Sequence, residues 1–313
     1  MGRFGFVLTR FAQAIPMLAG IVLVVFLLLH VAPGDPARNV AGPRASREEV
    51  AEIRTELGID RPLVVQYGDY AGGVLRGDLG FSYKSGESVA AMVGARIEPT
   101  LWLLGAGLAL TGVLTVPLAI VAARREGGVA DHLIRFVCLL GLSLPSFWVG
   151  AMLLLAFALL LPWFPAGGFG ESAWDHLRAV ALPGLALAVA SAPVLIRSLR
   201  ASILSAYDQD YVDTARSLGL SDGTILRRFV LRNASSSTVT LVALEVGYLL
   251  FGAVVIESTF AIPGIGQGLV LAARGRDLPA IQGYTLLFAV AVVVVNLVAD
   301  VVNTLLDPRV RIS

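Results

Sequence analysis

Glu245 is the carboxylate whose placement most suggests chemistry, because it stands inside a long apolar run of this 313-residue chain. A charged side chain in a membrane span costs a few kcal/mol, so it normally faces a cavity or a partner. Tyr248 follows three residues later and lies near Glu245 if the run is helical. Two roles are open for Glu245: it lines a substrate path with Tyr248, or it forms a structural hydrogen bond to a neighbouring helix.

Other chemistries find little support in the residue pattern. The histidines His30, His132 and His176 lie far apart and show no metal-ligand spacing. The single cysteine, Cys138, excludes a disulfide and a cysteine metal cluster within one chain. No G-x-x-x-x-G-K-[ST] segment is present, so this chain is not expected to hydrolyse ATP through a P-loop. We expect no catalytic residue, no metal ion and no bound cofactor.

The composition is that of a membrane protein. Hydrophobic residues make up 56% of the chain and charged residues 15%, whereas a soluble domain carries about 25% charged residues. The mean hydropathy is +0.78. The net charge of +1 gives no indication of a nucleic-acid partner. The chain is therefore expected to lie in a lipid bilayer.

Six apolar runs are each long enough to cross a bilayer as a helix of about 20 residues. They are Phe11–Ala32, Leu101–Ala123, Leu133–Leu161, Leu177–Arg197, Thr238–Ile256 and Tyr284–Leu306. Arg3 and Arg10 precede the first run, Arg124 and Arg125 follow the second, and Arg309 and Arg311 follow the last. The positive-inside rule then places both termini in the cytoplasm. The predicted fold is all-α and polytopic, with six transmembrane helices.

The third run is interrupted by GLSLPSFWVG at Gly141–Gly150. Pro145 removes a backbone donor, and such breaks are tolerated where they face protein or a cavity. The break is either a bend that shapes a pathway or a packing kink.

A polar segment divides the chain after the first run. We expect a first transmembrane helix within residues 1–32, an extracytoplasmic helical segment at 33–99, a five-helix core at 100–306 and a cytoplasmic C-terminus at 307–313. In the polar segment, Ser46 and Glu49 form a capping box and Gly58 is a stop, so a helix is predicted over Arg47–Leu57. Pro62 can open a second helix to about Leu75. The segment serves either as a dock for a binding protein or as a structural lid.

The stretch between the fourth and fifth runs is polar, arginine-rich and helical in pattern. A first helix is predicted over Gln209–Leu218, with one face shared by Tyr211, Ala215 and Leu218. Gly219 is a natural C-terminal cap, because glycine adopts a left-handed backbone at little cost. Ser221 can cap a second helix. One side of this helix would be apolar, with Ile225, Phe229 and Val230. The other side would be basic, with Arg227, Arg228 and Arg232.

From residue 197 to 232 this stretch carries six arginines and four aspartates, which places it in the cytoplasm. Its apolar side chains can pack on their own chain or on a partner.

Asp213-Thr214-Ala215, Gly219, Phe229 and Leu231 resemble the "EAA" loop of permease subunits of ABC importers. DYVDTARSLGLS followed by LRNA resembles the dipeptide/oligopeptide/nickel branch of that family. Further matching segments lie at AIPMLAGIVLVVFLLLHVAPGDP, at GDLGFS (77–82), at the Pro145 break and at ESTFAIPGIGQGLVLAARGRDLPAIQG. The sequence differs from the general pattern in having Asp213 and Thr214 for Glu and Ala, Phe229 for Ile, and serines in place of the later proline.

The resemblance implies a type I ABC importer permease fold and an ATPase docked on the cytoplasmic coupling loop at 198–237. It assigns ATPase coupling to Tyr211, Asp213, Thr214, Ala215, Arg216, Gly219, Leu220, Ser221 and Asp222. The expected translocation path is formed by Glu245, Tyr248 and Pro145. An external scoop-like loop at 257–283 would contact a binding protein or plug the entrance, through Glu257, Phe260, Pro263, Gly264, Gly266, Arg276 and Asp277.

The resemblance also implies the partners and the compartment. The partners are a second homologous permease, two ATPase subunits that hold ATP and magnesium, and an extracytoplasmic substrate-binding protein. The location is the cytoplasmic membrane of a bacterium or archaeon. ATP binding would draw the ATPases together and switch the spans between inward- and outward-facing arrangements, importing di- or oligopeptides. The same machinery can carry nickel chelates or haem-like cargo.

Two other classes remain as alternatives. An ion-coupled secondary transporter would use Glu245 or Asp300 as its ion site, but such carriers often show internal repeats and none is visible. An intramembrane protease needs a paired nucleophile and base, and Ser143 and Ser191 have no histidine near them.

Overall fold

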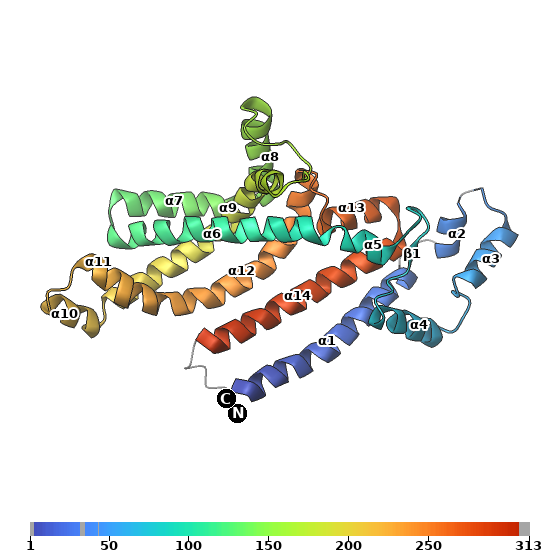
Figure 1. The fold of residues 1–313 in the computed structure, drawn as a ribbon, viewed down its shortest axis with the longest axis horizontal. Helices are drawn as coiled ribbons and strands as arrows, with labels where there is room; N and C mark the ends of the chain where they lie inside the picture. The colour runs from blue at the N-terminus through green and yellow to red at the C-terminus, as the bar shows by residue number, and fades with distance from the viewer. Residues whose placement is uncertain (1–2, 32–34, 43, 307–313) are drawn as a thin grey trace. The chain divides into compact units, whose positions relative to one another are not determined.

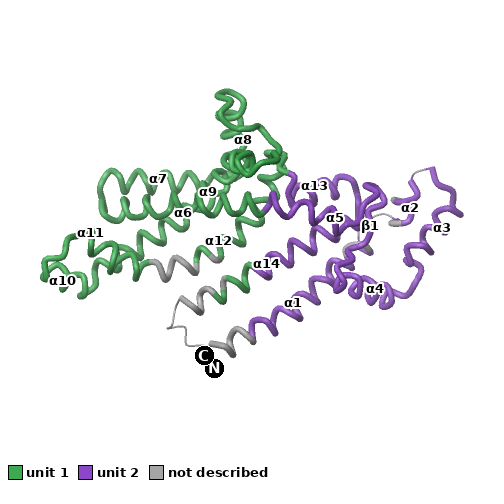
Figure 2. The backbone as a smooth tube through the Cα atoms, in the orientation of Figure 1, with its two compact units in different colours: residues 1, 101–262, 295–313 green, residues 2–100, 263–294 purple. Residues whose placement is uncertain are grey.

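The computed structural model describes residues 3–31, 35–42 and 44–306. Within these ranges the chain is helical except for short connections and one two-stranded hairpin, as Figure 1 shows. Two compact units are present (Figure 2). Unit 1 takes in residues 101–262 and the end of the chain from 295, and unit 2 takes in residues 2–100 and 263–294. The all-α class is confirmed.

Unit 1 is built around two long helices. Its elements are α6 (Ile97–Arg124, from residue 101 on), α7 (Val129–Ser143), α8 (Ser146–Leu153) with the π-helical turn η1 (Leu154–Leu160), α9 (Ala173–Tyr207), α10 (Asp210–Ser217), α11 (Asp222–Ile225), the π-helical turn η2 (Leu226–Val230) and α12 (Leu231–Thr259). Helix α9 packs against α7, α8 and α12 and is the most buried of these helices.

Small residues let α6 approach α9 closely. A Cβ atom built on Gly184 would lie 3.0 Å from the Cβ of Ala106, and one built on Gly107 would lie 3.3 Å from a methyl group of Leu187. Close backbone approach at small residues is how membrane helices gain packing energy, because lipid supplies no hydrophobic driving force between them. Substitution of Gly184 by a larger residue would therefore separate the two helices.

Two apolar clusters fill unit 1. One lies where α9 meets α10, α11 and η2, and includes Ile203, Val212, Ile225 and Val230, all fully buried. The other lies toward the opposite end of α9 and includes Leu187, Leu249, Ile256 and Phe260. The first cluster fixes the segment between the fourth and fifth predicted spans onto the helix bundle.

Pro145 ends one helix and precedes another, as predicted. It occupies the N-cap position of α8, and the axes of α7 and α8 differ by 104°. Figure 1 shows α8 turned away from the line of α7. The third apolar run is thus sharply bent at Pro145, and a role of this bend in a pathway stays a prediction.

The membrane-crossing helices are assigned by length and composition. Four helices in the described part of the chain qualify, and the bent pair α7–α8 makes a fifth if it counts as one span. Where the fifth span was predicted, α12 is a continuous helix of 29 residues, but the side chains of residues 235–240 and 243 are not described. The count of six spans stays a prediction.

Several helices extend beyond the predicted spans. Helix α9 runs on to Tyr207 beyond the predicted end at Arg197, α12 begins at Leu231 instead of Thr238, and α14 (Leu278–Leu306) begins before Tyr284. Apolarity marks only the part of a helix that lies in lipid, and the backbone continues helical until a breaker or cap stops it. Much of the predicted loops at 198–237 and 257–283 is therefore helix.

Unit 2 combines most of the first span with the polar segment. Its elements are α1 (Arg3–Val31), α2 (Pro36–Ala41), α3 (Arg47–Glu56), α4 (Leu63–Leu75), β1 (Phe81–Ser82), β2 (Glu87–Ser88), α5 (Val89–Gly94), α13 (Ile265–Gly275) and the first part of α14. The strands pair antiparallel, with Phe81 opposite Ser88 and Ser82 opposite Glu87. Val89, Ile265, Ala280 and Tyr284 lie in its core.

The local signals in the polar segment are confirmed. Ser46 and Glu49 form both hydrogen bonds of the capping box, Gly58 has a φ of +66°, and Pro62 stands just before α4. Helices α2 and α5 and the hairpin were not predicted, because such short elements give too little periodicity to detect. The predicted stop at Asp307–Arg309 and the arginines after it lie outside the described residues.

Candidate functional site

The coupling loop is anchored to unit 1 by a small apolar face of α10. Val212 is fully buried and Ala215 is 4% exposed, and both pack in the cluster that contains Ile203 of α9. The predicted face was Tyr211, Ala215 and Leu218. Tyr211 does pack there, but Leu218 is 75% exposed. Leu218 follows the last helical residue, so the turn carries its side chain away from the helical face.

Gly219 closes α10 as predicted. Its φ is +76°, a left-handed value that L side chains rarely adopt. The amide of Gly219 donates to the carbonyl of Arg216 at 2.9 Å, and the amide of Leu220 donates to that of Ala215 at 3.2 Å. These two bonds satisfy carbonyls that the helix end would leave unpaired.

The outer side of the loop is free of the chain's own packing. The exposed positions are Asp213, Thr214, Arg216, Gly219, Leu220, Ser221 and Asp222, together with Leu218. Arg216 and Asp213 form an ion pair at 3.4 Å, and at this exposure such a pair contributes little. Leu218 and Leu220 are apolar knobs that belong to none of the apolar clusters in the described part of the chain.

Ser221 was predicted to cap the second helix, but its side chain does not do so. It occupies the N-cap position of α11, but its side chain makes no capping bond and its hydroxyl pairs with that of Thr224 at 3.0 Å. The predicted faces of the second helix hold for Ile225 and Val230, which are buried, and for Arg227 and Arg228, which are exposed.

Helix α11 runs without interruption into α12. The π-helical turn η2 joins them, so no loop separates the coupling segment from the fifth predicted span. Single π-turns inside helices are uncommon and often occur at functional sites. The side chain of Asn233 on α12 donates to the hydroxyl of Tyr211 at 3.1 Å, which ties α10 to the same helix. A displacement of the loop therefore acts directly on α12.

An ion pair that the sequence did not reveal braces the same end of unit 1. Both guanidinium nitrogens Nε and Nη2 of Arg200 on α9 donate to the two carboxylate oxygens of Asp131 on α7, at 2.8 and 2.7 Å. The Gly127 amide donates to the same carboxylate at 3.1 Å, and Asp131 is 1% exposed. The hydrogen bonds from Arg200 lower the pKa of Asp131 despite its burial, with help from Gly127.

The three predicted path residues do not share one environment. Glu245 is 8% exposed and is hydrogen-bonded by the side chain of Ser191 on α9, which is also buried. Tyr248 is 71% exposed. Pro145 stands at the bend between α7 and α8. The contact of Glu245 with Ser191 favours the structural role, and a role in a path stays a prediction.

The seven residues that were predicted to contact a binding protein also differ in burial and lie in both units. Glu257 and Phe260 are at most 1% exposed inside unit 1, so neither offers a surface for a partner. In unit 2, Pro263 and Gly264 lead into α13, whose first amide, on Ile265, donates to the hydroxyl of Thr100 at 2.9 Å. Gly266 lies buried in the first turn of α13.

Arg276 and Asp277 are the last two of these residues. Arg276 is exposed and left-handed, at φ +54° and ψ +38°, whereas Asp277 is buried and accepts a hydrogen bond from Ser82. Of the seven residues, Arg276 has the most accessible charged side chain.

No group of three or more His, Cys, Asp or Glu side chains within the described ranges is placed to hold a metal ion. The arrangement is suited to transmitting a displacement, because an anchored loop with an apolar outer side is joined to a long helix.

Comparison with known proteins decides the family. Residues 115–312 match the model for the binding-protein-dependent transport system inner membrane component, and residues 3–103 match the model for the N-terminal part of such membrane components. The chain belongs to this family. The predicted recognition of an importer permease is therefore confirmed.

Relatives match over almost the whole chain. A protein of Brucella abortus (strain 2308), provisionally named a peptide transport system permease, is 38% identical over 97% of this chain and 98% of its own length. The glutathione transport system permease protein GsiC of Salmonella typhimurium (strain LT2) is 37% identical over 98% of both chains. The fold is also that of a chain of the MetNI methionine ABC transporter, with 14% identity, a TM-score of 0.58, and coverage of 69% of this chain and 96% of that one.

Proposed function

We propose that this chain forms one half of the membrane pore of an ATP-driven importer of peptides. Its family supplies the inner membrane components of binding-protein-dependent transport systems. Peptide cargo is supported by relatives named for peptide and glutathione transport, since glutathione is itself a tripeptide. The other half of the pore is a second, related permease, and an extracytoplasmic protein delivers the substrate.

The observation that carries the proposal is the two-sided coupling loop. Val212 and Ala215 fix α10 to the bundle, while Leu218 and Leu220 stand outward at the turn. Exposed apolar side chains on an anchored segment are suited to a cleft on a partner. The partner is an ATPase subunit, present in two copies, that holds ATP and magnesium. The loop lies on the cytoplasmic side of a bacterial or archaeal membrane, with both termini on that side.

The mechanism follows from the continuity of α11, η2 and α12. ATP binding draws the ATPases together and displaces the loop, and α12 moves with it because no flexible connection intervenes. Two packings of the bundle, inward- and outward-facing, then exchange as the ATPases bind and hydrolyse ATP. This chain supplies no catalytic residue for the hydrolysis.

The test is a substitution of the exposed Leu218. Leu218→Asp places a charge where we expect an apolar cleft, so the ATPase should no longer co-purify with the permease and uptake of peptide should fall at least tenfold. Leu75→Asp changes another strongly exposed leucine, at the end of α4 and far along the chain from the loop, and should leave co-purification of the ATPase unchanged. Co-purification and uptake that persist in Leu218→Asp would contradict the proposed docking.

A further inference from the structure

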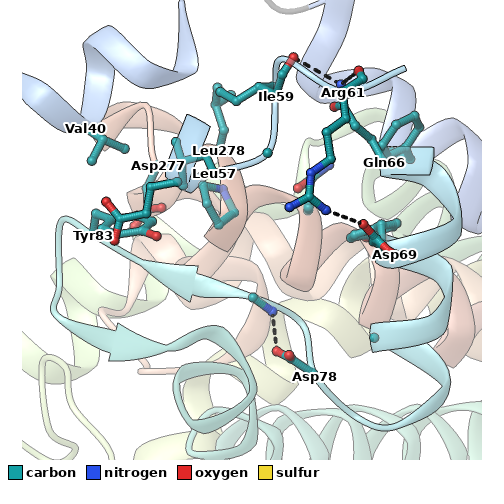
Figure 3. Close-up of a pocket in the computed structure, with 18 of the residues that line it drawn as sticks. Val40, Leu57, Ile59, Arg61, Gln66, Asp69, Asp78, Tyr83, Asp277 and Leu278 are labelled. Carbon is teal, nitrogen blue, oxygen red and sulfur yellow. Dashed lines mark hydrogen bonds and ion pairs between the residues drawn. The ribbon is translucent and has the colours of Figure 1, made fainter. Parts of the chain in front are cut away.

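Unit 2 contains a pocket, partly open to solvent, outside the coupling loop and the predicted path. Its volume is about 480 Å³, which lies within the range of small-molecule sites. Figure 3 shows Asp277 and Tyr83 on one side and Arg61 and Asp69 on the other. We call it the cap pocket. Its walls come from α1, α2, α3, α4, the turn before α4, the β1–β2 hairpin and the start of α14.

The walls of the cap pocket are largely apolar. They include Phe26, Leu57, Tyr70, Leu278 and Pro279. Phe26 is 4% exposed and its ring packs edge-on against that of Tyr67 and beside that of Tyr70. Burial raises the pKa of Tyr70 to about 12, so its hydroxyl stays protonated and can donate a hydrogen bond at any working pH.

Hydrogen bonds hold the pocket in shape. The Gln66 amide donates to the carbonyl groups of Ile59 at 3.1 Å and Arg61 at 2.7 Å, which fixes the turn before α4. On the opposite wall, Ser82 donates to Asp277 and Lys84 donates to the carbonyl of Gly275. The hairpin is therefore tied to the segment between α13 and α14, and little ordering is left for a ligand to impose.

The charged groups of the lining are mostly engaged within the protein. Arg61 pairs with Asp69 at 3.2 Å, Asp78 accepts from the Gly80 amide, and Asp277 accepts from Ser82 and from the Ala280 amide. Within the described residues, the side chains of two charged lining residues, Glu56 and Arg276, make no hydrogen bond or ion pair. One is negative and one is positive, so the charges left over suit a zwitterion.

Arg276 also has an unusual backbone. It occupies the left-handed position after α13, where glycine or asparagine is the ordinary residue. An arginine there costs conformational energy that glycine avoids, and such costs are concentrated at functional sites. The turn itself does not require an arginine.

The size of the pocket limits the ligand. A sphere of this volume is about 10 Å across, and an extended chain advances about 3.3–3.6 Å per residue. A peptide of two or three residues therefore matches the size of the pocket.

We propose that the cap pocket binds a di- or tripeptide with free termini, with its carboxylate on Arg276 and its ammonium group on Glu56. The peptide character of the ligand rests on the proposed function, but the zwitterion does not. A guanidinium can hold a carboxylate through two parallel hydrogen bonds, which suits the free C-terminus of a peptide. The pocket is a receptor site for peptide on the permease itself, separate from the binding protein.

The test is calorimetric titration of the full chain in lipid nanodiscs, without a binding protein, with trialanine. We expect measurable binding that weakens about tenfold or more for trialanine amide and for N-acetyl-trialanine, which each lack one terminal charge. Arg276→Gly should weaken trialanine binding to the same degree and fold normally, because glycine suits the left-handed turn. Glu56→Gln should weaken trialanine binding but leave the affinity for N-acetyl-trialanine unchanged.

The matched control is Arg274→Ala. Arg274 is exposed on the last turn of α13, two residues from Arg276, and does not line the pocket. Its loss should change trialanine affinity less than twofold. Absence of trialanine binding at millimolar concentration, equal binding to Arg276→Gly, or equal weakening by Arg274→Ala would each overturn the site. None of these outcomes bears on ATPase docking, which Leu218→Asp tests separately.

Discussion

The pair formed by Arg200 and Asp131 shows what a single side chain contributes in this bundle. The carboxylate is buried and accepts three hydrogen bonds, two of them from one guanidinium. Removal of the cation leaves a buried carboxylate without its main donor, and the penalty for that exceeds the net value of the intact pair.

Arg200→Met should therefore destabilise unit 1 by about 2 kcal/mol. Thermal unfolding in nanodiscs measures the effect. Arg216→Met is the control, because its ion pair with Asp213 is exposed and its loss should cost at most about 0.5 kcal/mol. Equal effects of the two substitutions would show that the buried pair has no special weight.

The same pair predicts a dependence of stability on pH. The pKa of Asp131 is lower in the folded chain than in the unfolded chain, where an aspartate titrates near about 3.9. Its contribution is thus fully present above that value and is lost as the pH falls through the lower folded pKa. The difference in thermal stability between wild type and Asp131→Asn should be constant from about pH 8 to 5 and shrink below about pH 4. A difference that does not change with acidification would be inconsistent with an ionised Asp131.

Glu245 is a second buried carboxylate, and its surroundings favour a structural role. Its hydrogen bond to Ser191 joins α12 to α9, and both residues are buried. Glu245→Gln keeps an oxygen that accepts this bond, so uptake and thermal stability should stay within about twofold and about 1 kcal/mol of the wild type. Glu245→Leu removes the bond and should cost about 1–3 kcal/mol. A loss of uptake in Glu245→Gln without loss of stability would show instead that the charge is needed.

At the scale of elements, the connection of α10 to α12 decides how the coupling loop works. Gly219 allows the left-handed turn, and the helix that follows continues through η2 into α12. The loop is therefore a short helix and a turn fixed to the end of one long helix, and the turn sets the position of Leu218.

Gly219→Pro should separate ATPase activity from uptake, because proline cannot adopt a φ of +76° and the turn must rearrange. We expect ATP hydrolysis that no longer responds to substrate and uptake reduced at least tenfold, with normal amounts of protein in the membrane. Gly223→Ala, where a new Cβ meets no atom within 4 Å, is the matched control and should behave like the wild type. Normal coupling in Gly219→Pro would show that the turn is not needed.

The elements also show what sequence can predict. Signals carried by neighbouring residues are confirmed, such as the capping box at Ser46, the glycine turn at Gly219 and the break at Pro145. Features that depend on distant residues were missed. The partner of Asp131 stands 69 positions away, and the helix ends that extend past the apolar runs carry no mark in hydropathy.

At the scale of the whole molecule, the two proposals fall in different units. The coupling loop belongs to unit 1 and the cap pocket to unit 2. The family, the all-α fold and the membrane character could be predicted from the sequence. The cap pocket could not, because its lining begins at Phe26 and ends at Gln282 in the sequence. Residues so far apart are brought together only by the packing of several helices and a hairpin, which no local pattern encodes.

The π-helical turn η2 has a consequence for chain length. A residue in an α-helix turns the backbone by about 100°, and a π-turn accommodates one residue more than an α-turn does. Deletion of one residue between Leu226 and Val230 would let a regular α-helix form there. The orientation of α10 and α11 about the axis of α12 would then be nearly preserved, because the deletion removes only the residue that the π-turn had absorbed. A deletion in the regular part of α12 has no π-turn to absorb it and would rotate the loop by about 100° about the helix axis, so the place of a one-residue change decides which way the loop faces.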